Sequence, residues 1–449
     1  MSDHKTRIEQ TKGGLLADPL APIRQQHATE GILEKMLSEK EEKCLQVFYL
    51  TDDAKDSSYE WFKNDVKEPE KGTCEWFLNH EHYKLWLERD SGPLIVTADP
   101  GCGKSVLARY LVDDVLQLRR EKPAVCYFFF KDQLQNRLSQ ALCAVLHQLL
   151  SKDRSLIEHA MPFYSSKGSG LRTATESLWE IFELAVLHHV GPVIFVLDAL
   201  DECDERDYQD LIKKLSNFFS PQNQVKQVKF ILTSRPYSNL TSKFSNLASG
   251  CQYIRIPGEE YGNEISQEVD LVIKARVAQL ATEKGLSARL QDCLLKELGK
   301  AEHRTYLWIH LVFAELKDLP MEDEMERKFS KLPKGIKEVY ENILDKSTEE
   351  EKAKRVLSIL LAAQRPLTLN ELCATVRIDI LLRESSQQLS FQTIDMEIGT
   401  TFEQMLRGWC GLLVSVYQGR VHFLHQTVRE FLLLRRPSID TTPNVRLLD

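Results

Sequence analysis

The pattern of hydrophobic and polar positions changes at about residue 72 and again at about residue 258. Between these points, short apolar runs alternate with amphipathic segments of helical period, which predicts βαβ units around a parallel sheet. The runs are rich in β-branched and aromatic residues, as expected of strands that are covered on both faces. The predicted strands are residues 93–98, 124–130, 192–199, 228–234 and 253–258.

After residue 258, apolar positions follow a helical period over most of the chain. Helices are predicted for residues 264–285, 287–319 and 334–346. Two short apolar runs, residues 411–417 and 420–425, are joined by Gln418-Gly419 and predict a hairpin. Helices followed by a two-stranded wing indicate a winged-helix module.

The first 70 residues are polar and rich in charge. Within them, residues 31–48 carry apolar side chains at helical spacing, namely Ile32, Leu33, Met36, Leu37 and Leu45. We interpret this part as a solvated lead-in to the sheet domain. A short accessory arm that binds a partner is the alternative.

The composition excludes several classes of protein. The chain has 449 residues, of which 43% are hydrophobic, so it can build about three domains of roughly 150 residues each. Its formal charge of −8 lacks the basic footprint of a general nucleic-acid binder, and we expect no nucleic-acid partner. The ten cysteines form no C-x-x-C pair, and no window approaches the roughly 18 apolar residues of a membrane helix. We therefore expect a cytoplasmic protein with reduced thiols.

The most specific motif follows the first predicted strand, where residues 98–105 read ADPGCGKS and lead into an amphipathic helix. The spacing matches a phosphate-binding P-loop, except that Ala98 replaces the first glycine. Glycines let the backbone wrap a phosphate, Lys104 is placed to reach the β- and γ-phosphates, and Ser105 is placed to bind Mg²⁺. The predicted nucleotide-binding residues are Asp99, Pro100, Gly101, Cys102, Gly103, Lys104, Ser105 and Val106.

A second motif ends the strand at residues 192–199, which runs into the carboxylates of Asp198, Asp201 and Glu202. We expect Asp198 to serve the Mg²⁺ of a bound triphosphate, because this ion takes hard oxygen ligands. Asp201 or Glu202 would orient or deprotonate the attacking water. The alternative for this pair is a solvated helix start, where negative charge is favourable anyway.

Arg235 ends the next strand, within the sequence TSRP. Ligands of open α/β sheets bind beyond the carboxyl ends of the strands, so this arginine would face the phosphates and the charge that develops during transfer. It could equally pair with a neighbouring carboxylate.

With these motifs, the sequence resembles the NACHT branch of the STAND nucleotide-binding regulators, and most of all the NACHT-domain proteins of filamentous fungi. The resemblance runs from about Gly72 to about Leu434 and includes the phosphate loop, the Asp-Ala-Leu-Asp-Glu form of residues 198–202, TSRP, YLWIHLV, LPKGIKEVYENIL, RPLTLNEL and FLHQTVREFLL. It implies an α/β fold with a three-layer P-loop sheet domain, a helical domain and a winged-helix domain. The expected boundaries are 1–70 for the arm, 71–258, 259–335 and 336–449.

The resemblance also implies functions for single residues. ATP or ADP and Mg²⁺ would be the ligands, with Ser105 and Asp198 at the metal and Asp201, Glu202 and Arg235 as catalytic residues. His425, in FLHQTVREFLL, falls where the family brings a histidine to the β-phosphate of ADP; a buried core histidine is the alternative. Residues 73–76 match the segment that contacts adenine.

The function implied is an ATP/ADP-controlled switch with slow ATP hydrolysis that forms homo-oligomers when activated and recruits an unidentified protein partner in intracellular signalling. A scaffold that holds ADP with negligible turnover is the alternative from another class. A nucleic-acid motor and a small-molecule kinase fit less well, because of the charge and the long helical tail. Cys102 adds one hypothesis: if exposed beside the phosphates, its thiol would be reactive, and bound ADP would protect it.

Overall fold

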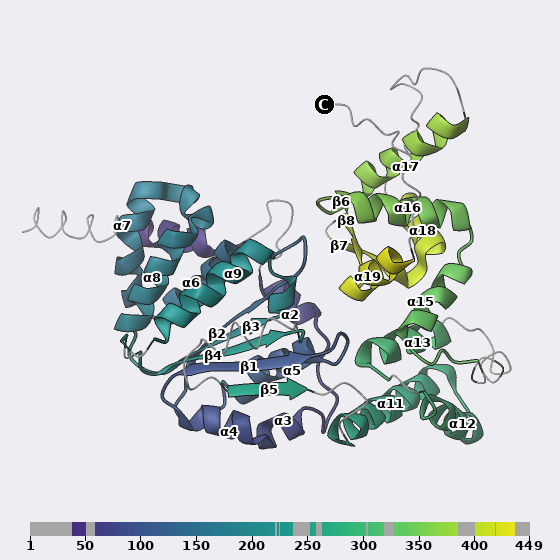
Figure 1. Ribbon diagram of the computed structural model, residues 1–449, viewed down its shortest axis with the longest axis horizontal. Coiled ribbons are helices and arrows are strands. Elements are labelled where there is room, and N and C mark those ends of the chain that lie inside the picture. The colour runs from purple at the N-terminus through teal and green to yellow at the C-terminus, as the bar shows by residue number, and fades with distance from the viewer. Residues whose placement is uncertain are drawn as a thin grey trace, which may run out of the picture.

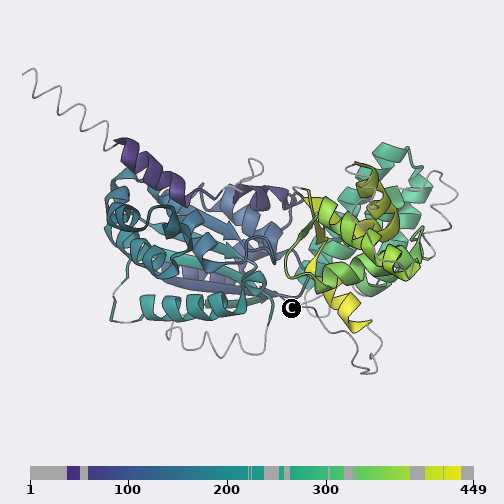
Figure 2. The ribbon, with the colours of Figure 1, turned by 90° about the horizontal axis from the view of Figure 1, so that it is seen from above.

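The computed structural model describes residues 38–50, 59–220, 222–223, 225–236, 252–256, 263–301, 304–317, 327, 329, 331–384, 400–417 and 419–435. The described part forms two lobes that lie side by side, as Figure 1 and Figure 2 show. One lobe contains the parallel sheet, and the other contains the helical and winged-helix parts. The apolar residues Ile32, Leu33, Met36 and Leu37 lie outside the described residues.

The sheet has five strands in the order β2-β3-β4-β1-β5, and every neighbouring pair is parallel. The strands are β1 (Gly92–Ala98), β2 (Ala124–Phe129), β3 (Val193–Asp198), β4 (Val228–Ser234) and β5 (Gln252–Ile256). Each lies within two residues of the run predicted from the sequence. The phosphate-loop strand β1 lies between β4 and β5, and β3 lies beyond β4. The carboxyl ends of β4 and β3, which lead to Arg235 and carry Asp198, are therefore next in order to the end of β1. The predicted parallel α/β fold is confirmed.

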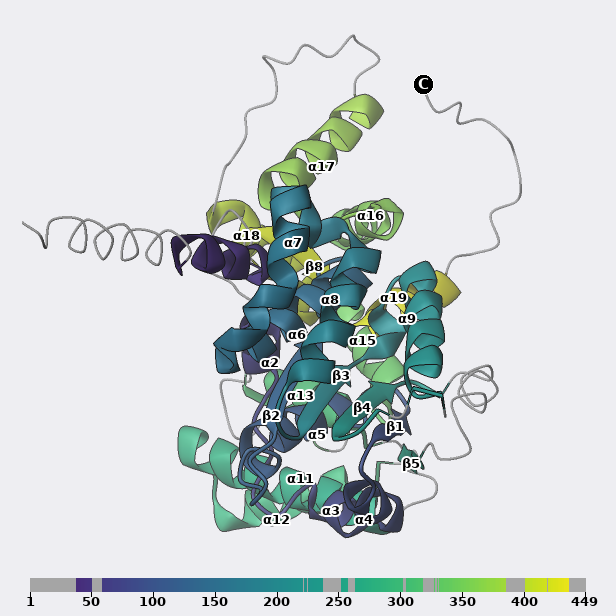
Figure 3. The same ribbon diagram turned by 90° about the vertical axis from the view of Figure 1, so that its left-hand side faces the viewer.

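The two faces of the sheet contribute to two separate hydrophobic cores. Along β1, Leu94 and Val96 belong to one core while Ile95 belongs to the other, as the two-residue period of a strand requires. Helices α6 (Leu138–Lys152), α7 (Ile157–Lys167), α8 (Thr175–His188) and α9 (Glu205–Phe218) cover the face of Ile95. In Figure 3, α6, α7 and α8 face the viewer.

The opposite face packs against α3 (Glu75–Asn79), α4 (Glu81–Glu88) and α5 (Lys104–Tyr110). The helix expected after the phosphate loop changes character along its length. Only residues 104–110 are α-helical, and a π-helical turn, η1 (Leu111–Val115), continues it. Such turns are uncommon and are frequent near functional sites.

Residues 38–48 form a helix that packs on the sheet domain. Cys44 and Phe48 are fully buried in the core that α6 and α8 share. Arg172 closes the end of this helix, because its guanidinium donates to the carbonyls of Gln46, Val47 and Tyr49 at 3.1, 2.8 and 3.3 Å. The interpretation as a solvated lead-in is therefore wrong for residues 44–48, which bury the apolar face of their helix.

The second lobe begins with α11 (Asn263–Lys284), α12 (Ala288–Leu298) and α13 (Tyr306–Lys317). The single helix predicted for residues 287–319 is divided, because α12 ends at Leu298 before Gly299 and α13 starts anew at Tyr306. Ser287 caps α12 by accepting the N–H of Leu290.

The winged-helix part contains α15 (Ile336–Asp345), α16 (Glu350–Ala362), α17 (Leu369–Glu384), α18 (Thr400–Cys410) and α19 (Gln426–Leu434). The predicted hairpin is present as β7 (Val414–Tyr417) and β8 (Arg420–Phe423), which pair in antiparallel register. A third short strand, β6 (Leu367–Thr368), adds to β8 and was not predicted, because it has only two residues. None of the helices in the described ranges has both the length and the apolarity needed to cross a bilayer.

Candidate nucleotide-binding site

The phosphate loop has the backbone that its glycines predict. Gly101 and Gly103 both adopt φ +79°, a conformation that residues with a Cβ atom avoid. Ala98 is instead the last residue of β1 and pairs with Ile256, so the position of the missing first glycine needs no positive φ. The ammonium group of Lys104 donates to the carbonyls of Ala98 and Asp99 at 2.8 and 3.2 Å. The loop is thus a closed turn with its lysine at the start of α5.

Asp198 lies at the tip of β3 beside this loop and is only 1% exposed. Its Oδ1 accepts the hydroxyl of Thr233 at 2.6 Å, and Ser105 is a second hydroxyl partner. Burial raises the pKa of Asp198 to about 6, against the opposing effects of Ser105, Thr233 and Lys104. A buried carboxylate with too little compensating charge beside a serine hydroxyl suits a divalent cation with oxygen ligands. Ser105 and Asp198 therefore fit the predicted Mg²⁺.

The chain turns sharply after Asp198. Ala199 adopts the left-handed conformation with φ +57°, and its N–H donates to the hydroxyl of Thr233 at 2.9 Å. Asp201 and Glu202 follow in a single 3₁₀ turn, Leu200–Glu202. The turn brings both carboxylates to the edge of the sheet where the phosphate loop lies.

Asp201 is paired with Arg235, the arginine that follows β4. The backbone N–H of Arg235 donates to Oδ1 at 3.0 Å and its Nε lies 2.9 Å from Oδ2. The same guanidinium reaches α19 of the winged helix, at 2.6 Å to Glu430 and 3.1 Å to Gln426. Burial raises the pKa of Asp201, and Lys104 opposes that effect. Both predicted roles of Arg235 are thus compatible with its position, and it joins two domains.

Glu202 contacts the segment that follows β2. Its carboxylate accepts the backbone N–H of Asp132 at 3.0 Å and lies 3.8 Å from the ammonium group of Lys131. Burial alone would raise the pKa of Glu202, but Lys131 and the N–H of Asp132 outweigh it, and the pKa lies below its ordinary value. Glu202 is therefore ionised at neutral pH, as a water-activating base must be.

His425 immediately precedes α19 and faces the same region. Its Nδ1 accepts the backbone N–H of Thr427 at 3.2 Å and contacts the Thr427 hydroxyl at 2.8 Å. Burial, followed by the charge of Lys131, lowers the pKa of His425 to about 4, so the imidazole is neutral at pH 7. Glu202 also influences this pKa, which brings the histidine into the electrostatic reach of the site. Its role at the β-phosphate remains a prediction.

The helical domain contacts the phosphate loop directly, which the sequence motifs did not indicate. The N–H of Tyr306, at the start of α13, donates to the carbonyl of Gly101 at 3.0 Å. A Cβ atom on Gly103 would lie 2.8 Å from the Tyr306 ring, and one on Gly101 would lie 3.1 Å from Leu307. The two glycines therefore also make room for α13.

A pocket adjoins the other side of the loop, lined by residues that include Thr73, Cys74, Trp76, Val106 and Leu107. Glu268 lies at its wall, 7% exposed, and accepts the Trp76 indole N–H and the Tyr306 hydroxyl, each at 3.2 Å. Burial raises the pKa of Glu268, and the N–H of Cys74 opposes it. Thr73, Cys74 and Trp76 thus line a pocket beside the loop, and their contact with adenine remains a prediction.

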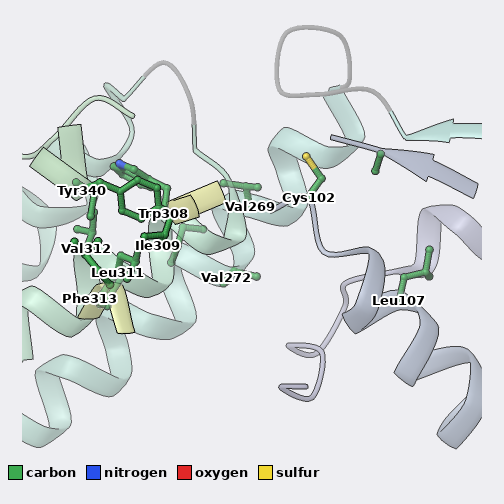
Figure 4. Close-up of a cluster of buried hydrophobic side chains, with 14 of the residues drawn as sticks. Cys102, Leu107, Val269, Val272, Trp308, Ile309, Leu311, Val312, Phe313 and Tyr340 are labelled. Atoms are coloured by element: carbon green, nitrogen blue, oxygen red, sulfur yellow. The ribbon is translucent and has the colours of Figure 1, made fainter. Parts of the chain in front are cut away.

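Cys102 does not meet the condition set for a reactive thiol. It is 9% exposed and belongs to the buried cluster that contains Leu107, Val269 and Val272 (Figure 4). Its side chain therefore contributes to the contact between the phosphate loop and α11.

Three residues that matter to this geometry carry no motif of their own: Lys131, Glu268 and Tyr306. A lysine after a strand, a glutamate in a helix and a tyrosine at a helix start are common in any sequence. Of these three residues, only Tyr306 lies in a segment of the family resemblance, YLWIHLV. The structure gathers the predicted residues at one edge of the sheet, while their individual roles remain predictions.

Comparison with known proteins matches three separate parts of the chain. A family model described as nephrocystin 3, N-terminal, matches residues 72–235. A domain of unknown function (DUF7069) matches residues 265–319, and the winged-helix domain of GPI inositol-deacylase matches residues 340–441. The predicted winged-helix module is therefore confirmed.

The chain is 25% identical over 434 residues to the vegetative incompatibility protein HET-E-1 of Podospora anserina, a fungal NACHT-domain protein. The match covers 92% of the chain and 30% of that protein, so the chain spans less than a third of its relative. The resemblance to fungal NACHT-domain proteins is thereby confirmed.

Among solved structures, the ORC2 protein of Aeropyrum pernix in ADPNP–ADP complexes overlaps 83% of the chain and 97% of its own, at 12% identity and a TM-score of 0.39. Cdc6p of Pyrobaculum aerophilum overlaps 86% and 98%, at 11% identity and a TM-score of 0.38.

Proposed function

From the premise that this chain is a relative of the fungal NACHT-domain proteins, we propose that it is a regulatory NTPase whose bound ATP or ADP sets the position of the winged helix. Slow hydrolysis returns the chain to its ADP form. The ATP form assembles into homo-oligomers and recruits a protein partner. This activity belongs to signalling in the cytoplasm and needs no nucleic acid.

One observation carries the proposal: Arg235 contacts Asp201 of the nucleotide site and Glu430 and Gln426 of the winged helix at once. The guanidinium is 10% exposed, so these contacts lie in a partly dehydrated place where charge interactions are strong. A γ-phosphate beside the loop would compete with Glu430 for the same cation. ATP and ADP would then differ in affinity for the two domain arrangements, which a nucleotide-controlled equilibrium requires.

Different residues at this end of the sheet would bind the phosphates, hold the Mg²⁺ and activate the water. The loop N–H groups and Lys104 would bind the phosphates, and Mg²⁺, held by Ser105 and Asp198, would neutralise their charge. Glu202, which is ionised and accepts the N–H of Asp132, would orient the attacking water and accept its proton. Arg235 would stabilise the charge that develops on the phosphates.

The test compares the native chain with Lys104→Ala and Glu202→Gln, and with Glu205→Gln as a matched control on an exposed carboxylate three residues further along the chain. The native chain should release ADP on denaturation and hydrolyse bound ATP in a single turnover. Lys104→Ala should hold no nucleotide, and Glu202→Gln should bind ATP but hydrolyse it at least about a hundredfold more slowly. Glu205→Gln should behave as the native chain.

Light scattering of Glu202→Gln with ATP and with ADP tests the assembly step. A larger species only with ATP supports the switch. Bound ADP without turnover in any variant would instead favour the scaffold that holds ADP. Failure of the native chain to bind either nucleotide would refute both.

A further inference from the structure

Residues 59–70, the strap, lie along the nucleotide cleft and contact the elements on both of its sides. The strap contains α2 (Glu60–Asp65) and the extended residues after it. Lys63 pairs with Asp113, and Arg109 donates to the carbonyl of Val66. Arg109 also pairs with the carboxylate of Glu68 at 3.0 Å. These contacts attach the strap to the helix and the π-helical turn that follow the phosphate loop.

The strap is also attached to the helical domain. Glu70 pairs with Arg276 of α11 at 3.2 Å, and the ammonium group of Lys67 lies 2.7 Å from Nδ1 of His310 on α13. The strap therefore contacts both walls of the cleft. It precedes the nephrocystin-type match, which begins at residue 72.

Two pockets meet at this point. The first is the largely apolar pocket of Trp76, Val106 and Leu107. The second is lined by Ser105, Asp198 and Glu202. The residues that line both pockets are Lys67 and His310.

A nucleotide matches this pair of pockets, because it joins an apolar planar base to a charged phosphate chain. If the base occupies the first pocket and the terminal phosphates occupy the second, the sugar and the α-phosphate lie at the shared edge. Lys67 and Arg276 approach each other at this edge, where burial and then the charge of Arg276 lower the pKa of Lys67. The nearby carboxylates of Glu70 and Glu68 pair with Arg276 and Arg109. An anionic ligand there would therefore stabilise the charged form of Lys67.

His310 leaves the ammonium group available to a ligand. Burial, then the charges of Lys67 and Arg276, lower the pKa of His310 to about 4, so the imidazole is neutral at pH 7 and its Nδ1 accepts one hydrogen from Lys67. An ammonium group has three donors, so the bond to His310 orients Lys67 and leaves two donors.

We propose that Lys67, oriented by His310, binds the α-phosphate at the sugar–phosphate junction of the nucleotide, and that the strap makes nucleotide affinity depend on a segment outside the family's nucleotide domain. This inference rests on the proposed nucleotide-binding function. It adds a phosphate ligand that no P-loop motif marks, and it places that ligand on the chain that connects the sheet domain to the helix at residues 38–48.

The test measures the affinity of the nucleotide-free full chain for ADP, ATP and adenosine by calorimetry or competition. Lys67→Met should weaken ADP and ATP equally, by about fivefold to tenfold, as expected for a charged hydrogen bond at a partly exposed site, and should leave adenosine unchanged. Lys67→Arg should recover part of the loss. Lys71→Met is the matched control, since Lys71 is an exposed lysine next to the strap that lines neither pocket, and it should change none of the affinities.

Three results would overturn the inference. If Lys67→Met lost equal affinity for adenosine and for ADP, Lys67 would be a structural residue. If it lost no affinity for ADP, Lys67 would not contact the nucleotide, while the proposed function would stand. Absence of ADP binding by the native chain would remove the proposed function and this inference together. The melting temperatures of the nucleotide-free variants show whether each remains folded.

Discussion

The ring of Tyr306 lies over Gly103, so close that a Cβ atom on the glycine would stand 2.8 Å from it. The third residue of the phosphate loop pattern G-C-G is therefore constrained twice, by its φ of +79° and by a side chain from another domain. A P-loop that only binds phosphates would have the first constraint but not the second. Both constraints can be tested without nucleotide.

Gly103→Ala should destabilise the chain by about 2–4 kcal/mol, the sum of left-handed strain and steric overlap. Gly92→Ala provides the control, because Gly92 has φ +129° but nothing within 4 Å of its Cβ position, so it adds strain without overlap. Thermal or urea denaturation of the nucleotide-free chain measures both. Gly103→Ala in the background of Tyr306→Ala should cost less than in the native chain, by about 1 kcal/mol or more. Strict additivity of the two changes would disprove the docking contact.

Glu430→Gln should loosen the winged helix from the nucleotide site. The carboxylate is 44% exposed, which limits its contribution, so we expect ADP to dissociate only about threefold to tenfold faster. Stopped-flow release of a fluorescent ADP gives the rate. Glu403→Gln is the control, because Glu403 pairs with Arg407 within α18 and should have no effect. Equal release rates for Glu430→Gln and the native chain would show that Arg235 does not couple the domains.

Acid should destabilise the chain partly through His425, whose pKa of about 4 lies below the 6.5 of an unfolded histidine. The unfolded state binds more protons between these values, so the contribution of His425 is present above pH 6.5 and is lost as the pH falls towards 4. Asp198, with a pKa raised to about 6, acts in the opposite direction in the same window. Melting curves of native chain and His425→Gln from pH 7.5 to 4.5 should therefore converge on acidification, by about 1–2 kcal/mol. A difference that does not change with pH would contradict a buried neutral histidine.

The helix at residues 38–48 should depend on Arg172. Arg172→Ala removes three hydrogen bonds to the carbonyls at the end of this helix, and we expect a local loss of about 1–3 kcal/mol. Arg154→Ala removes the exposed ion pair to Glu42 on the same helix and should change stability by less than about 0.5 kcal/mol. Hydrogen exchange at residues 38–50 distinguishes the two variants. Equal protection in both would show that the helix does not need this cap.

The parts predicted well from the sequence are those whose signal is local. The strand before Asp99 and the strand before Ala199 are continuous apolar runs, and the loop between Gly101 and Ser105 has a fixed spacing. Local patterns of this kind specify both backbone and position. The hairpin around Gln418-Gly419 was predicted for the same reason.

The rest could not be predicted because it depends on which elements meet. Lys67, Lys131 and Tyr306 come from segments far from the phosphate loop, and no periodicity connects them with it. The segment at residues 44–48 was misjudged because the first 70 residues are polar and rich in charge as a whole, although Cys44, Leu45, Val47 and Phe48 are apolar and buried together. For Cys102 the sequence supported only a conditional statement, reactive if exposed, because the loop motif does not show that α11 packs beside it.

The backbone conformation of Ala199 gives the three carboxylates of the acidic motif three different sets of partners. A left-handed residue after Asp198 reverses the direction of the chain, so carboxylates that are neighbours in sequence point to different parts of the molecule. Asp198 accepts the hydroxyl of Thr233, Asp201 contacts Arg235 and thereby the winged helix, and Glu202 contacts the turn after β2. Under the proposed function, this one backbone position would let residues 198–202 serve the ion, the domain arrangement and the attacking water separately. A larger β-branched residue in place of Ala199 would be expected to disconnect all three at once.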